Sequence, residues 1–218
     1  MPLTPPAARE PLHARDIRIC GYRRADGLFD IEAQLADTKS YGFVNRDRGF
    51  IAAGESLHGM ALRLTVDDSM TIVASEAATD HAPYAVCPSA APAFSALAGL
   101  QIRPGFLREA NHRVGGAVGC THLRELLQQL ATVAYQTINP YRAWRDAQER
   151  GEPDQPGSDR LDARVSQRMM AKRVPIVNSC RAYASDGEIV RRRWPELYTG
   201  ADNTDAGATE AAAATAAS

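Results

Sequence analysis

A thiol and an imidazole lie two residues apart in the stretch Gly119-Cys120-Thr121-His122-Leu123. The stretch follows a glycine-rich turn and precedes a long run with helical apolar periodicity, so both side chains are expected at a helix N-terminus. The unpaired N–H groups and partial positive charge of a helix N-terminus favour a thiolate and a neutral imidazole. Neutral imidazole is the form that binds metals. This segment is therefore expected to form part of a functional site.

The chain over 57–77 is expected to form a β-hairpin with its turn at Asp67-Asp68-Ser69. Side chains alternate between the two faces of a strand, and a turn centred on Asp68 gives the hairpin one mostly apolar face. His58 and Glu76 are the only ionisable groups on that face outside the turn, and this register places them diagonally at one end. An apolar face that ends in a histidine and a carboxylate favours a polar pocket at the edge of the core.

A metal site would form if His122 lies at the same end of the sheet as this pair. Alternation along the preceding strand also brings Asp37 toward that end, two residues after the apolar face finishes at Leu35. Two imidazoles and one carboxylate, from Glu76 or Asp37, form a typical catalytic ligand set for zinc or non-haem iron(II). The metal ligands that we expect are His58, Glu76 and His122.

Four polar residues are candidates for the chemistry around such a metal, namely Asp37, Lys39, Tyr41 and Arg63. The divalent ion would polarise an oxygen of a small organic substrate or activate a water. Lys39, Tyr41 or Arg63 would then handle protons or bind an anionic group. Lyase or hydrolase chemistry fits best, because neither needs an organic cofactor and the sequence contains no dinucleotide or Walker motif. The absence of a G-x-S-x-G motif argues against an α/β-hydrolase.

Each candidate residue also has a structural interpretation. Histidines on buried strands commonly hydrogen-bond within the core, His122 could cap its helix, and Glu76 could pair with Arg63. Cys120 could be a ligand, a nucleophile or a packed thiol, although its i, i+2 spacing to His122 makes a dyad geometrically poor. The alternative to an enzyme is therefore a non-catalytic ligand-binding or assembly protein with structural histidines.

The composition is that of an ordinary globular protein, with 218 residues, 44% apolar, 23% charged and a formal net charge of −1. The near-neutral charge does not support a nucleic-acid or membrane-surface partner. No apolar run approaches the roughly 18 residues of a membrane span. The N-terminus lacks the apolar segment of a signal peptide, so a cytoplasmic location is expected. The expected partners are a small-molecule substrate and a second copy in a homodimer.

The four cysteines lie at positions 20, 87, 120 and 180, and no two of them form a C-x-x-C pair. All four are expected to be free thiols. Strands precede helices along the chain, which predicts an α+β fold with an antiparallel sheet of N-terminal hairpins packed by C-terminal helices. The expected strands cover 17–23, 28–44, 57–66 and 70–77. The expected helices cover 89–97, 106–113, 121–139, 141–148 and 161–172, with short extended pieces at 174–177, 180–183 and 188–190.

A single ordered domain is expected over residues 15–198, with a loose linker at about 149–159. Residues 1–14 hold four prolines and no periodic apolar pattern, which indicates a mobile arm. Residues 199–218 are small and rich in alanine, so this tail is expected to be disordered because it has little to bury.

Several segments resemble those of a known bacterial family. They are Asp26-Gly27-Leu28-Phe29-Asp30-Ile31-Glu32, Asp37-Thr38-Lys39-Ser40-Tyr41, Ala53-Gly54-Glu55-Ser56-Leu57-His58-Gly59-Met60, Leu100-Gln101-Ile102-Arg103-Pro104-Gly105-Phe106, Gly119-Cys120-Thr121-His122-Leu123 and Tyr135-Gln136-Thr137-Ile138. Together they are similar to the proteins grouped as domain of unknown function 2889, over roughly residues 15–198. Relatives often carry an aspartate where this chain has Gly59, so any role of that carboxylate is absent here. The resemblance implies no assigned activity; the family's association with proteobacterial catabolism implies an aromatic or other hydrophobic small molecule as substrate.

Overall fold

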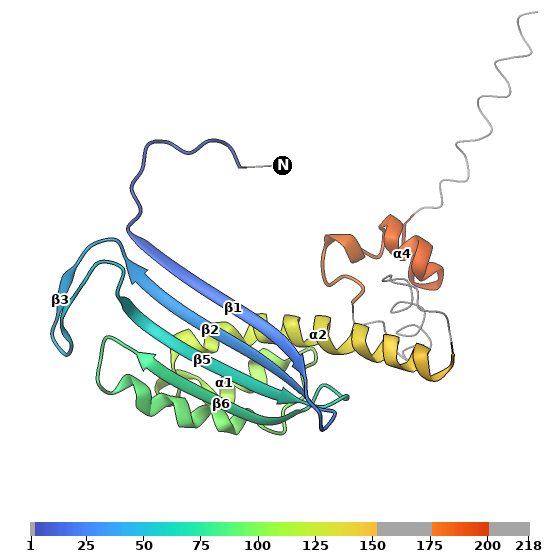
Figure 1. Cartoon of the computed structure of the whole chain (residues 1–218). Helices are drawn as coiled ribbons and strands as arrows, with labels where there is room; N and C mark the ends of the chain where they lie inside the picture. Colours follow the sequence, from blue (N-terminus) through green and yellow to red (C-terminus); the bar gives the residue numbers. More distant parts are fainter. Residues whose placement is uncertain (1–2, 152–175, 201–218) are drawn as a thin grey trace, which may run out of the picture. The chain divides into compact units, whose positions relative to one another are not determined.

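The structure, a computed structural model, describes residues 3–151 and 176–200 (Figure 1). The chain divides into two compact units, Met1–Asp146 and Ala147–Ser218. In the second unit, the described part contains η3 (Arg181–Tyr183), α4 (Glu188–Arg193) and η4 (Pro195–Leu197). Val190 and Trp194 form the buried centre of this part. The candidate site lies entirely in the first unit.

Four long strands of the first unit form one antiparallel sheet in the order β1-β2-β5-β6 (Figure 1). They are β1 (His13–Arg23), β2 (Phe29–Lys39), β5 (Ser56–Val66) and β6 (Ile72–His81). A small hairpin, β3 (Phe43–Asn45) and β4 (Gly49–Ile51), connects β2 to β5. The turn between β1 and β2 depends on Gly27, whose φ of 88° is a conformation that glycine adopts without steric cost.

Helices cover one face of this sheet. They are η1 (Cys87–Leu97), α1 (Phe106–Val114), η2 (Gly116–Val118) and α2 (Thr121–Glu149). The inward face of β2 carries Phe29, Ile31, Ala33 and Leu35, all buried, as strand alternation requires. These side chains share one core with a leucine stripe of α2 at positions 123, 126, 127 and 130. The predicted α+β class is thereby confirmed.

The principal helix is longer than predicted. Instead of ending near Asn139-Pro140, α2 continues through the proline to Glu149. The proline removes one backbone hydrogen bond, but the apolar stripe continues across it, with Ile138 fully buried and Tyr141 packed edge-on against Phe29 at 5.7 Å between ring centroids. Among the described residues, no helix is both long and apolar enough to cross a membrane.

Several local predictions differ from the structure. The expected strand over 28–44 is interrupted after Lys39, so that 43–45 forms a separate short strand. The predicted extended pieces at 180–183 and 188–190 are wrong, because these segments form η3 and α4. β1 begins at His13, within the segment predicted to be a mobile arm. Several predicted segments lie outside the described residues. They are the helix at 161–172, residues 174 and 175 of the extended piece at 174–177, and most of the linker and of the tail.

Candidate metal centre

Asp37 lies at the end of the apolar inward face of β2. It takes the next inward position after Leu35, and its side chain is only 1% exposed. Its cross-strand neighbours are Arg15 on β1 and His58 on β5. A shift of register between Asp37 and the next residue interrupts the regular pairing with β5 at this point. A guanidinium, a carboxylate and an imidazole therefore lie in one row across three strands.

Arg15 and His58 fix the orientation of the Asp37 carboxylate. Arg15 donates from Nε to Oδ1 at 2.7 Å and from Nη2 to Oδ2 at 2.8 Å. His58 Nδ1 lies 2.9 Å from the same Oδ2. Burial alone would favour the protonated acid, but the hydrogen bonds and charges of Arg15 and His58 hold the pKa of Asp37 below its ordinary value. The carboxylate is therefore ionised at neutral pH.

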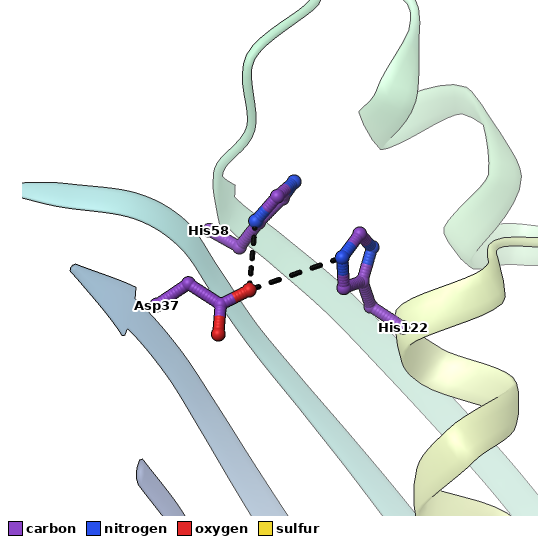
Figure 2. Close-up of side chains that lie close together, drawn as sticks. All are labelled: Asp37, His58 and His122. Carbon is purple, nitrogen blue, oxygen red and sulfur yellow. Dashed lines mark hydrogen bonds and ion pairs between the residues drawn. The ribbon is translucent and has the colours of Figure 1, made fainter. Parts of the chain in front are cut away.

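His122, the second residue of α2, brings a second imidazole to this carboxylate. Its Nε2 lies 3.8 Å from Asp37 Oδ2. The His58 and His122 ring centroids are 3.9 Å apart, with the planes inclined at 34° (Figure 2). The buried Leu123 anchors this first turn of α2 in the core. Burial and the nearby His122 lower the pKa of His58, despite the opposing effect of Asp37, so the neutral, metal-binding form of His58 is favoured.

The three side chains point toward one another from two strands and a helix (Figure 2). Asp37, His58 and His122 each offer one ligand atom, and these atoms lie within 4.8 Å of one another. Among residues 3–151 and 176–200, no other group of three or more such side chains meets this spacing. Ligand atoms around a zinc ion lie about 3–4 Å apart, as follows from metal–ligand bonds of about 2.0–2.2 Å. The separations within the trio, at most 4.8 Å, are close to this range.

Further polar side chains surround the trio. Arg15 Nη1 also pairs with Glu125, which lies one helical turn after His122 on α2. His13 Nε2 lies 3.5 Å from Asp37 Oδ1. The sequence prediction did not include these three residues. The alternation of positions 13, 15, 17 and 19 could have identified two of them, because it puts His13 and Arg15 on the same face of β1 as two partly buried isoleucines.

A comparison with known families assigns the chain to one of them. The family model described as "Protein of unknown function (DUF2889)" matches residues 13–136. This chain belongs to the DUF2889 family. The matched region begins at the first residue of β1 and contains Asp37, His58 and His122. No curated protein and no solved structure matches the chain.

The structure of this DUF2889 protein does not bring Glu76 to the site. The predicted hairpin register is wrong, because the hairpin pairs Val66 with Ile72 and a register shift at Thr65/Val66 then places Glu76 opposite Arg63. The Glu76 side chain is 77% exposed and pairs with Arg63. Arg63 also binds Glu32, an outward-facing residue of β2, so neither Arg63 nor Glu76 lies on the face that carries Asp37. Of the two carboxylates expected near the histidines, Asp37 is the one that lies beside them.

Two other predicted residues flank the strand end that carries Asp37. Lys39 is the last residue of β2, and its Nζ lies 5.4 Å from the centroid of the Tyr41 ring. Tyr41 is half-exposed and lies in the connection to β3. Cys120 packs between the trio and the core, with Sγ 4.0 Å from His122 Nδ1 and 3.8 Å from Met60 Sδ.

The Glu76→Gln variant is expected to bind metal as the wild type does. Its free energy of unfolding should change by less than about 1 kcal/mol, because exposed ion pairs contribute little. Elemental analysis and thermal unfolding of the purified variant measure the two quantities. A folded Glu76→Gln protein without metal, beside a metal-loaded wild type, would return Glu76 to the ligand set.

Proposed function

We propose that this DUF2889 protein is a metal-dependent enzyme that binds one zinc or iron(II) ion through Asp37, His58 and His122. The observation that carries the proposal is the approach of three ligand atoms to within 4.8 Å of one another at the end of a buried sheet face. Two imidazoles and one carboxylate leave coordination positions open for water or substrate, as catalytic zinc and non-haem iron sites do.

The charges around the trio support a cation rather than an anion. Asp37 and Glu125 contribute two formal negative charges and Arg15 one positive charge, so these three side chains together carry a formal charge of about −1. The carboxylate is also buried, where the surroundings screen its charge less than water would. A divalent ion here would be attracted by the cluster and would leave it with a positive charge.

For the reaction, we propose lyase or hydrolase chemistry on a small aromatic or hydrophobic molecule. The metal would supply a Lewis acid for a substrate oxygen or an activated water. Lys39, the last residue of β2, and Tyr41, in the connection to β3, would bind an anionic substrate group or transfer protons. The matched family is described as one of unknown function, so the support for this reaction class comes from the chemistry of the site.

The metal content of the wild-type protein tests this proposal. Protein purified without chelator should contain close to one zinc or iron ion per chain, and chelation should lower its melting temperature. Re-addition of the ion at 100 times its dissociation constant should stabilise the fold by about 2.7 kcal/mol, since the ion binds the folded state. A metal-free protein whose melting temperature responds neither to chelator nor to added zinc or iron would overturn the proposal.

The hydrogen bonds to Asp37 favour one second candidate, a non-catalytic ligand-binding or assembly protein. Arg15 and His58 already satisfy both carboxylate oxygens, so the cluster could be a structural network without a metal. Under this candidate, histidine variants would lose stability by the same amount with and without chelator. The metal proposal predicts that the loss depends on metal.

A further inference from the structure

Arg15 joins two carboxylates that belong to different layers of the fold. Its Nε and Nη2 bind Asp37 on the sheet, and its Nη1 binds Glu125 on α2. Glu125 lies three residues after His122, on the same side of the helix. One guanidinium therefore connects the strand that carries Asp37 to the helical turn that carries His122.

This connection has a directional character that the surrounding packing lacks. Leu123 and Leu126 bury this turn of α2 in the core, and apolar contacts of this kind depend weakly on direction. A planar guanidinium that binds a carboxylate with two parallel hydrogen bonds instead fixes the plane of that carboxylate. Its third contact limits the rotation and sliding of the helix start against the sheet.

We propose that Arg15 and Glu125 are positioning residues of the metal centre, which fix the distance between Asp37 and the imidazole of His122. This inference rests on the proposed function, because it concerns the same ion. It goes beyond the ligand set, since it assigns the coordination geometry to two residues that do not contact the metal. Outer partners of metal ligands commonly change metal affinity by about 10–100-fold when they are removed.

Arg63 provides a matched control on the opposite face of the sheet. Its Nε donates to Glu32 at 2.7 Å and its Nη1 to Glu76 at 3.2 Å, so it also joins two carboxylates of neighbouring elements. Its side chain is 48% exposed, compared with 31% for Arg15. The Arg63→Met variant removes the same type of ion-pair network at a distance from the trio.

Cobalt(II) is the probe, because its visible absorption reports coordination geometry and it occupies zinc sites. Full-length wild type is titrated with Co2+ beside Arg15→Met, Arg15→Lys, Glu125→Ala and Arg63→Met. We expect Arg63→Met to match the wild type in affinity and band positions. Arg15→Met and Glu125→Ala should bind Co2+ about 10–100-fold more weakly and with shifted bands. Arg15→Lys retains the charge without the planar fork, so its affinity should be intermediate and its bands should still shift.

The outcomes separate this inference from the proposed function. If the wild type binds Co2+ and both Arg15→Met and Glu125→Ala reproduce its affinity and bands, the positioning role is overturned while the metal centre stands. If the wild type binds no Co2+, both proposals are overturned. Should Arg15→Met fail to fold, Glu125→Ala and Arg15→Lys decide the question by the same spectra, because both retain a positive charge beside Asp37.

Discussion

The His58→Ala and His122→Ala variants are expected to lose their metal while keeping the fold. Each substitution removes one of three protein ligands, so the affinity should fall by more than the roughly 100-fold that the loss of an outer partner can cause. The fold should persist because both side chains lie at the polar end of the core, 12% and 26% exposed, rather than in its apolar interior. Elemental analysis and circular dichroism measure the two properties.

The matched control for these variants is His112→Ala, which removes an exposed imidazole from the last turn of α1. It should retain the metal of the wild type. If His58→Ala and His122→Ala also retained it, the ligand assignment would be wrong. If the wild type itself contained no metal and the two variants were destabilised equally in chelator and in added zinc, the structural interpretation of the histidines would hold instead.

The Asp37→Asn variant is expected to be the most strongly destabilised of the site variants. Hydrogen bonds to charged groups contribute about 1.5–3 kcal/mol, and the loss stays in this range because Arg15 is 31% exposed and keeps its pair with Glu125. Asp37 is 1% exposed and is the carboxylate that Arg15 binds through two nitrogens. The free energy of unfolding, measured by denaturant titration of the metal-free proteins, should fall by an amount in this range.

The pH dependence of this loss has a definite sign. The pKa of Asp37 in the folded protein is lowered, so the ionised carboxylate stabilises the fold above its unfolded pKa and loses that effect as the pH falls through the folded pKa. The difference between wild type and Asp37→Asn should therefore be full near neutral pH and should narrow below about pH 4. As a control, Asp26→Asn breaks an exposed pair with Arg24 and should destabilise the fold much less than Asp37→Asn does. Equal losses for the two variants would contradict the role of burial.

The sequence predicted the part of the site that depends on strand alternation and on the helix start. Period two along β2 and β5 places Asp37 and His58 on the inward face, and the glycine-rich turn before α2 places His122 in its first turn. The position of Glu76 could not be predicted in this way. A register shift at Thr65/Val66, between the turn and Glu76, reverses the face that Glu76 occupies, and alternation carries no signal of an inserted residue.

The outer partners depend on contacts between distant parts of the sequence. Arg15 and Glu125 are 110 residues apart, and only the packing of α2 across the sheet brings them together. β1 is an edge strand with few buried side chains, so its apolar alternation is weak and its first residues resemble a loose arm. In the second unit, Val190 and Trp194 are the buried pair at i, i+4 spacing, a helical signal that is easily missed in so short a segment.

The proposed metal centre is tested most directly by anomalous diffraction at the zinc edge, on crystals of the full chain grown with zinc. We predict one strong peak between the three side chains, about 2.0–2.2 Å from a nitrogen of His58, a nitrogen of His122 and an oxygen of Asp37. A zinc-loaded crystal with no anomalous peak between these side chains would contradict the proposed metal centre.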